Sequence, residues 1–303
     1  MRRLLFALPL LIYAAACSAI PGAFLPPTDS SSPVASATIP PGPALPPQAL
    51  RNALYPLPGF GDAIHACSLQ EGACTVDDPV VGRIEVRLIE PFAFGDLNDD
   101  GAQDAAVLLA ARAGGSGVFV SLHAVLNQNG QPQPAASSLI DDRPLVQRLT
   151  IDNGRIVLDA TVHDHDDAAC CPEWQVRRAF RLVGLSLMMV QAITYLPDGR
   201  ERSVVIESPR PGEEIGDQIY LSGRVTIAPF ENTLAYRVYN REGKELFAGP
   251  LMVDAPQPGT PGVFLALLNA DRLPRGRLRL VVVDLSPVDA SILALDSVEI
   301  MVR

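Results

Sequence analysis

Short apolar runs of strand length recur along the chain from about Arg51, separated by frequent turn signals. Some runs alternate apolar and polar residues, as in a half-buried strand, and others are continuously apolar, as in a strand covered on both faces. Asp152-Asn153-Gly154 between two such runs predicts a hairpin. We therefore expect a mainly antiparallel β-sheet with minor helical cover. The predicted strands are 83–89, 105–111, 118–126, 149–151, 155–160, 174–182 and 185–196, with one short helix over 47–54.

Beyond Pro197-Asp198-Gly199 the pattern becomes more regular, and seven strand-like runs fill about a hundred residues. They are 203–207, 218–227, 233–239, 245–253, 262–268, 277–284 and 297–302. This number of strands is typical of an immunoglobulin-like β-sandwich. Alternation assigns an inward-facing set to its core: Ile219, Leu221, Val225, Leu234, Tyr236, Val238, Leu280, Val282, Val298 and Ile300. This stretch contains no Cys or Trp, so packing alone must hold the two sheets together.

The chain opens with a secretory leader, in which Arg2 and Arg3 precede an apolar run that ends before Cys17. Small residues before a lone Cys resemble the lipobox of bacterial lipoproteins, in which the Cys is acylated and becomes the mature N-terminus. Ala14 departs from that pattern, which usually has Leu there. The alternative is an ordinary cleavable signal peptide with an incidental Cys. We expect a signal peptide over 1–16 and a lipid anchor on Cys17 at the outer face of the cytoplasmic membrane.

The residues behind Cys17 are rich in Pro, Ala and Ser and carry almost no charge. Such a composition cannot bury enough apolar surface to order itself, and proline favours extended polyproline II. Residues 17–50 are therefore predicted to be a disordered tether. The remaining chain is long enough for two domains, expected at 51–200 and 201–303.

The chain is acidic, with a formal net charge of −10. Removal of Arg2 and Arg3 with the leader makes the mature charge about −12. An acidic surface without a Lys/Arg cluster repels phosphate backbones, so nucleic acid is not expected as a partner.

Four cysteines remain after Cys17, and disulfides persist in an extracytoplasmic compartment. They are Cys67, Cys74, Cys170 and Cys171. A vicinal bridge strains the peptide between its two cysteines, which favours long-range pairing of Cys170 and Cys171 with different partners. The rival arrangement is a local Cys67–Cys74 loop with a vicinal bridge. Either way, we expect structural disulfides and not redox-active or zinc-binding thiols.

An acidic loop offers the sharpest candidate metal site, because oxygen side chains stand at alternate positions around a glycine turn. Asp96, Asn98, Asp100 and Asp104 occupy loop positions one, three, five and nine, which suits calcium. The loop resembles those of EF-hands and FG-GAP-type repeats, but Val107 stands where the bidentate Glu would be. The alternative is an Asx-rich turn that satisfies its own backbone.

His163 and His165 are a weaker candidate pair, since two imidazoles on one face of an extended strand can bind zinc or copper. The alternative is a solvated acidic loop at a strand end.

The first folded region resembles the LppP/LprE-type bacterial lipoproteins over roughly residues 80–185. The resemblance is carried by segments 94–101, 104–107, 114–117 and 152–158 and by Cys170-Cys171-Pro172. It implies an anchored or secreted protein without assigned chemistry. Similar proteins often show the Cys-Cys-Pro step without evident distant cysteines, which favours the local Cys67–Cys74 pair.

The C-terminal region resembles the immunoglobulin-like domain of bacterial spore germination proteins over almost its whole length. The matching segments are 206–212, 221–225, 230–234, 236–238, 249–251 and 261–264. The resemblance implies a non-catalytic cell-envelope module.

Catalytic motifs are scarce in this sequence. Gly114-Gly115-Ser116-Gly117 lacks the second glycine of a nucleophile elbow, so a hairpin turn is expected there. No metalloprotease, P-loop or dinucleotide fingerprint is present. We therefore expect a non-catalytic, lipid-anchored binding protein, with calcium as a cofactor and an envelope protein or cell-wall polymer as its partner. The alternative is a calcium-assisted extracytoplasmic hydrolase.

Overall fold

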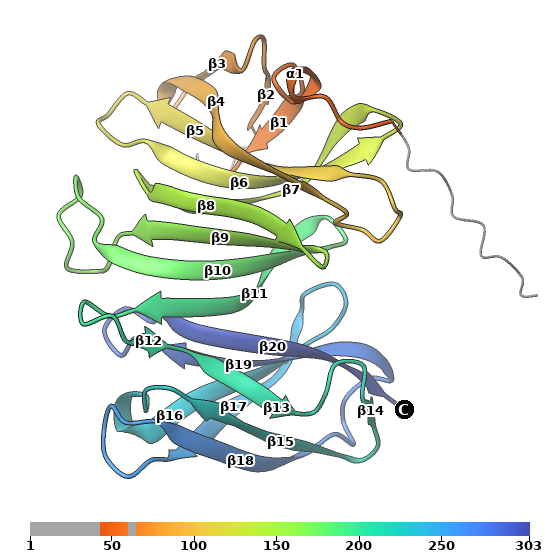
Figure 1. Ribbon diagram of the computed structural model, residues 1–303, viewed down its shortest axis with the longest axis vertical. Coiled ribbons are helices and arrows are strands. Elements are labelled where there is room, and N and C mark those ends of the chain that lie inside the picture. Colours follow the sequence, from red (N-terminus) through yellow and green to blue (C-terminus); the bar gives the residue numbers. More distant parts are fainter. Residues whose placement is uncertain (1–42, 60–64) are drawn as a thin grey trace, which may run out of the picture. The chain divides into compact units, whose positions relative to one another are not determined.

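β-Strands make up most of the chain that the structure describes, and almost all of them pair in antiparallel fashion (Figure 1). The computed structural model describes residues 43–59 and 65–303. The predicted leader, Cys17 and most of the predicted tether lie outside these residues. The predicted fold class, mainly β with minor helix, is confirmed. In the described ranges no helix has the length and apolar character needed to cross a bilayer.

A five-stranded antiparallel sheet forms the first layer, in the order β3-β4-β5-β6-β7. Its strands are β3 (Ala73–Asp78), β4 (Gly82–Gly95), β5 (Asp104–Ala113), β6 (Phe119–Gln128) and β7 (Gln131–Asp142). The residues of β5 from Asp104 to Leu109 are all buried, because the sheet is covered on both faces. This burial explains why that part of the sequence is continuously apolar and does not alternate.

One face of this sheet is covered by the N-terminal part of the described chain, which comprises α1 (Pro47–Leu50), β1 (Leu54–Leu57) and β2 (His65–Ser68). Leu45, Leu50 and Tyr55 are buried in this cluster, and each such apolar side chain contributes roughly 2 kcal/mol through burial. The structure therefore differs from the predicted tether at its C-terminal end, because residues before Arg51 already belong to the folded part. The helix is also shorter than the predicted 47–54, since the chain turns into β1 at Leu54.

The other face packs against a second group of strands. They are β8 (Leu145–Asp152), β9 (Arg155–Val162), β10 (Trp174–Val183) and β11 (Ser186–Tyr195). Leu108 and Leu122 of the first sheet meet Leu158 and Phe180 in the shared core. The predicted Asn-Gly turn joins β8 to β9.

The C-terminal residues form a β-sandwich with its own apolar core. Its strands are β12 (Glu201–Arg202), β13 (Val204–Ser208), β14 (Glu214–Ile215), β15 (Gln218–Val225), β16 (Thr233–Tyr239), β17 (Glu245–Asp254), β18 (Gly262–Asn269), β19 (Gly276–Leu285) and β20 (Ile292–Val302), with a 3₁₀ turn η1 (Phe230–Asn232). Strand β17 pairs with β16 along most of its length and, through Val253 and Asp254, with β18, so it links the two layers. All ten residues predicted to face inward are buried in the core, as expected.

Strands β11 and β20 join the two regions into one continuous hydrogen-bonded path, β20-β11-β10-β9-β8. The pairing is short, with Gln191 opposite Asp296 and Ala192 opposite Leu295. A small apolar cluster, Ala192, Val281, Val283 and Leu295, lies at this junction. The junction brings turns of the first region close to β19 and β20 of the sandwich, and this places the cavity described next.

Candidate functional site

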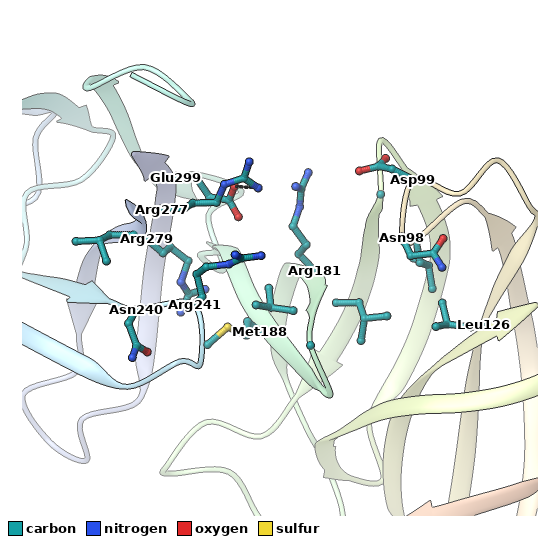
Figure 2. A pocket seen from close by; sticks show the side chains of 16 residues that line it. Asn98, Asp99, Leu126, Arg181, Met188, Asn240, Arg241, Arg277, Arg279 and Glu299 are labelled. Carbon is teal, nitrogen blue, oxygen red and sulfur yellow. Dashed lines mark ion pairs between the residues drawn. The ribbon is translucent and has the colours of Figure 1, made fainter. Parts of the chain in front are cut away.

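A cavity of about 420 Å³ lies where the β4–β5 loop, the β8–β9 turn and the end of β10 face the β16–β17 turn, β19 and β20. Figure 2 shows Arg241, Arg277, Arg279 and Glu299 along one side, Arg181 beside them, and Asn98 and Asp99 across the opening. The complete lining is Leu97, Asn98, Asp99, Leu126, Gly154, Arg181, Leu182, Val183, Gly184, Met188, Asn240, Arg241, Arg277, Leu278, Arg279 and Glu299. Four arginines in one cavity contrast with a chain whose net charge is −10.

Strand periodicity places two of these arginines. Arg277 and Arg279 stand two residues apart on β19, so they share one face of the strand, while Leu278 between them is buried in the sandwich core. Arg241 lies in the β16–β17 turn, where the side-chain oxygen of Asn240 accepts hydrogen bonds from the backbone N–H groups of Glu242 (3.1 Å) and Lys244 (2.8 Å). That turn fixes the chain segment from which the Arg241 side chain extends.

Arg181 reaches the same cavity from the other region. It lies near the end of β10, and its Nη2 donates to the backbone oxygen of Asn153 at 3.4 Å, in the β8–β9 turn. The long contact is to a neutral carbonyl, and among the described residues Arg181 forms no ion pair. Its charge is therefore not neutralised by the protein.

Arg279 is the most buried of the four guanidinium groups. Its Nη1 donates to the backbone oxygen of Met189 at 3.0 Å, and the group lies over the ring of Tyr239, 5.1 Å from the ring centre. The Nε atom is buried and has no hydrogen-bond partner among the described residues. Burial lowers the pKa of this guanidinium, although the group stays protonated near neutral pH. A buried donor without an acceptor costs free energy.

The cavity keeps an excess of positive charge. Only two carboxylates line it, Asp99 and Glu299, and only Glu299 contacts an arginine, with its Oε2 3.5 Å from Nη1 of Arg277. The Arg277 side chain is 58% exposed and that of Glu299 is 37% exposed, so solvent screens the interaction and it is weak. Four guanidinium groups against two carboxylates leave a formal charge of +2.

The chemistry that this lining supports is recognition. Its side chains supply fixed positive charge, N–H donors and an aliphatic floor that includes Leu97, Leu126 and Met188. The described residues around the cavity include no Ser, Thr, Cys, His, Lys or Tyr. Guanidinium groups do not exchange protons near neutral pH, so the four arginines are suited to binding an anion and not to proton transfer.

The predicted calcium loop borders this cavity through Asn98 and Asp99, but its carboxylates hold backbone groups. The Asp96 carboxylate accepts hydrogen bonds from the N–H groups of Asn98 (3.1 Å), Asp99 (2.8 Å) and Gly101 (2.8 Å). The Asp100 carboxylate accepts the side-chain amide of Asn98 at 2.9 Å and the N–H of Ala102 at 2.7 Å.

Asp104, the fourth residue of the calcium set, uses both of its carboxylate oxygens to accept hydrogen bonds from backbone N–H groups. It is fully buried, and its two oxygens accept the N–H groups of Leu97 and Asn127, each at 2.8 Å. Burial raises the pKa of this carboxyl, against the lowering effect of the two N–H donors. Within the described ranges, no three His, Cys, Asp or Glu side chains come together as a metal site. In this conformation the loop has the Asx-turn arrangement, in which the carboxylates of Asp96 and Asp104 accept hydrogen bonds from backbone N–H groups. Calcium binding by the four residues stays a prediction.

The two histidines are also separated in their contacts. Strand β9 ends at Val162, so His163 and His165 lie in the loop that follows it and do not share a strand face. The Nδ1 of His163 lies 3.0 Å from Oδ2 of Asp141 in β7, whereas Nε2 of His165 lies 3.1 Å from Oδ1 of Asp166. Each imidazole thus contacts a different carboxylate, and zinc or copper binding by the pair stays a prediction.

The cysteines are joined locally. One disulfide links Cys67 of β2 to Cys74 of β3, with 6.1 Å between their Cα atoms. The other joins the adjacent Cys170 and Cys171, in the exposed loop before β10. The structure therefore has the arrangement that the lipoprotein resemblance favours, and not the long-range pairing that peptide strain favours.

A second surface of interest lies on the sandwich. The outer faces of β15, β17 and β18 carry large apolar side chains that are more than half exposed: Tyr220, Met252, Val263, Leu265 and Leu267. Tyr220 is paired with Leu267 across the two strands, so these side chains form a contiguous apolar patch. Apolar patches of this kind on soluble domains are typical of contact sites.

The arginine cavity is the feature that sequence reasoning missed. The alternation of Arg277 and Arg279 along a predicted strand is the one available signal, because it places two charges on one face. Arg181 and Arg241 carry no such signal, since turns and the β11–β20 pairing bring them to the cavity.

A comparison with known protein families supports the immunoglobulin-like fold of the C-terminal β-sandwich. Residues 203–291 match the family model described as the immunoglobulin-like domain of bacterial spore germination, a segment that runs from β13 through β19. The predicted C-terminal immunoglobulin-like domain is therefore confirmed. The match covers less than half of the chain. The comparison with curated proteins finds no match.

Proposed function

We propose that this chain is a non-catalytic binding protein of the bacterial cell envelope, held at the outer face of the cytoplasmic membrane by lipid on Cys17. The observation that carries the proposal is the cavity, whose lining combines four arginines and two carboxylates with aliphatic side chains, a set of charges and hydrogen-bond donors suited to binding an anion. The immunoglobulin-like match at residues 203–291 and the exposed apolar patch on the sandwich support an interaction role.

The envelope location rests on the leader and on Cys17. A Cys17→Ala variant tests it directly, because the unlipidated chain should move from the membrane fraction to the soluble extracytoplasmic fraction. The wild-type chain should incorporate labelled palmitate and the variant should not. A variant that still sediments with membranes would contradict the lipid anchor.

The partner that we propose is an envelope protein or a cell-wall polymer. Residues 43–303, immobilised and exposed to detergent-treated envelope extract, should retain the partner. Starting at residue 43 keeps Leu45 and Leu50, which are buried in the core. The alternative of a calcium-assisted hydrolase predicts instead turnover of esterase, glycosidase or peptidase substrates that is lost in Asp100→Ala. Turnover without any retained partner would reverse the choice.

Calcium remains a proposal for the loop that contains Asp96, Asn98, Asp100 and Asp104. Binding would require Asp96 and Asp100 to exchange hydrogen bonds to the backbone for bonds to the ion. Extracellular calcium modules work at roughly 10⁻⁴ to 10⁻³ M. Calorimetry in that range should give heat that disappears in Asp96→Asn. Absence of heat at millimolar calcium removes the ion from the proposal.

A further inference from the structure

We propose that the arginine cavity is a binding site for a phosphate group, recognised by Arg181, Arg241, Arg277 and Arg279. The inference deepens the proposed binding role and rests on it, since it names the chemical class of the ligand. The cavity borders the predicted calcium loop through Leu97, Asn98 and Asp99 and the predicted hairpin turn through Gly154, but its four arginines belong to no motif of the sequence.

The net positive charge of the cavity lining favours an anionic ligand. The cavity carries a formal +2 in a chain of −10, so its positive charge runs against the field of the rest of the molecule. Arg181 and Arg241 form no ion pair among the residues that the structure describes, and Arg279 makes its hydrogen bond to a neutral carbonyl. An incoming anion therefore does not have to displace a protein carboxylate from these three arginines.

Geometry and residue type favour phosphate over a single carboxylate. Guanidinium groups are planar and donate through several N–H groups, so they bind the oxygens of phosphate in bidentate fashion. A carboxylate has two oxygens in one plane, which one arginine can satisfy. Here the arginines come from three elements, β10, the β16–β17 turn and β19, with Arg241, Arg277 and Arg279 along one side of the cavity and Arg181 beside them (Figure 2). A tetrahedral group with charge near −2 matches both this arrangement and the +2 of the lining.

The buried Nε of Arg279 gives a second, independent indication. It is a donor without an acceptor in the described structure, and Arg279 lines a cavity that is large enough for a small organic phosphate. A phosphate oxygen in the cavity would accept from this donor. The aliphatic side chains of Leu126 and Met188 then provide a surface for the carbon part of a phosphate ester.

The test is calorimetric titration of the full chain carrying Cys17→Ser, which lacks the predicted lipid and keeps every described residue. The probes are inorganic phosphate, glycerol 3-phosphate and, as the carboxylate comparison, succinate. We expect phosphate and glycerol 3-phosphate to bind, with affinity falling as sodium chloride rises, and succinate to bind at least about tenfold more weakly.

Two double variants of equal charge provide the matched comparison. Arg241→Gln with Arg277→Gln removes two exposed cavity arginines, whereas Arg112→Gln with Arg148→Gln removes two exposed arginines of β5 and β8 outside the cavity. The cavity variant should lose roughly tenfold or more in phosphate affinity, and the comparison variant should stay within about twofold of the parent. Both should melt close to the parent, because all four side chains are at the surface. Equal losses in the two variants, tighter binding of succinate, or no phosphate binding would overturn the assignment.

Vesicles distinguish the sources of the phosphate. Binding to phosphatidylglycerol vesicles that is lost in the cavity variant, with none to phosphatidylcholine vesicles, identifies a lipid headgroup. Binding of glycerol 3-phosphate without vesicle binding identifies a free or polymer-borne phosphate. Failure of the inference is separable from failure of the proposed function: a partner retained equally by the parent and by the cavity variant leaves the binding role in place and excludes the phosphate site.

Discussion

Asp104 shows how one buried carboxylate can organise two distant segments of backbone. Its oxygens hold the N–H groups of Leu97 and Asn127, which belong to the β4–β5 loop and to the end of β6. The β4–β5 loop lines the arginine cavity, so the conformation of the cavity edge depends on this side chain. The role of Asp104 is therefore structural in the described conformation, although the sequence places it in a calcium set.

Replacement of this carboxylate should be costly. Asp104→Ala leaves two buried N–H donors without an acceptor, each costing about 1–3 kcal/mol, so we expect a loss of about 3 kcal/mol in the free energy of unfolding. Asp100→Ala is the matched control, because that side chain is exposed, and it should cost less than about 1 kcal/mol. Urea unfolding measures both. Equal effects of the two substitutions would contradict the assigned role.

Asp284 gives a prediction for pH. It is almost fully buried in β19, pairs with Arg202 at 3.0 Å, and keeps one oxygen, Oδ1, without a hydrogen-bond partner. Burial raises the pKa of this carboxyl, against the lowering effect of Arg202. The folded state therefore binds the proton more tightly than the unfolded state. The protonated Asp284 carboxyl therefore stabilises the folded state fully at pH values below its pKa in the unfolded chain. This stabilisation is lost as the pH rises through the pKa of the carboxyl in the folded protein.

The comparison with Asp284→Asn isolates this effect. The stability of the parent relative to the variant should fall as pH rises from about 4, near the unfolded pKa of an aspartate, toward neutrality. Urea midpoints of both chains at several pH values in that window provide the measurement. A difference that is constant with pH, or one that grows in the opposite direction, would show that Asp284 does not titrate in this way.

At the scale of single elements, β15 depends on a glycine in its middle. Gly223 stands opposite Ile206 of β13 and Phe264 of β18. A Cβ atom at this position would collide with the backbone oxygen of Val205 and with the ring of Phe264, and a backbone atom cannot move aside without breaking the β13–β15 pairing. The close approach of the two strands therefore requires glycine.

The expected consequence is loss of sandwich stability. Gly223→Ala should cost about 3 kcal/mol, at the upper end for overpacking, whereas Ser222→Ala in the same strand should cost under about 1 kcal/mol. Differential scanning calorimetry of the two variants measures this contrast. A tolerated alanine would mean that β13 can separate from β15 at little cost.

A strand could be predicted from the sequence when the burial of its two faces leaves a clear pattern of apolar and polar residues. Strands of the sandwich alternate because one face is buried and the other is exposed, and so β16 is predicted to the residue and the others to within a few residues at most ends. Strand β7 was not expected, because its sequence contains Pro132 and Pro134 among small polar residues. It is an edge strand, where proline is tolerated since one side of the strand needs no ladder hydrogen bonds.

The candidate site was less predictable than the strands. Local patterns suggested ligand sets from residues close in sequence, such as Asp96 to Asp104 and His163 with His165, and the structure uses these side chains for backbone and carboxylate contacts. The cavity instead combines arginines more than fifty residues apart, Arg181 with Arg241 and Arg279. Such a set depends on the pairing of β11 with β20, for which a single sequence carries no signal.

At the scale of the whole described chain, the decisive feature is the junction between the first region and the sandwich. Besides the β11–β20 pairing, Ser297 donates to the backbone oxygen of Val190 at 2.9 Å, and Arg279 donates to that of Met189. The apolar cluster of Ala192, Val281, Val283 and Leu295 is buried between these polar contacts. Burial and hydrogen bonds of this kind should couple the unfolding of the two regions.

Trp174, the only tryptophan of the sequence, lies in β10 and reports on the first region alone. Leu221→Ala creates a cavity in the sandwich core and should remove about 2–5 kcal/mol there. If the junction couples the two regions, this substitution should lower the urea midpoint measured by Trp174 fluorescence, although Leu221 does not belong to the core that contains Trp174.

The control is to repeat the comparison in a chain that already carries Ala192→Asp. A carboxylate at this buried position should open the junction while leaving both cores intact. In that background, Leu221→Ala should no longer move the Trp174 transition, whereas Leu122→Ala in the first region should still move it. If Leu221→Ala leaves the urea midpoint measured by Trp174 fluorescence unchanged even without Ala192→Asp, the two regions unfold independently. The arginine cavity takes residues from both regions, so a cooperative junction would help to hold its four arginines in one arrangement for phosphate recognition.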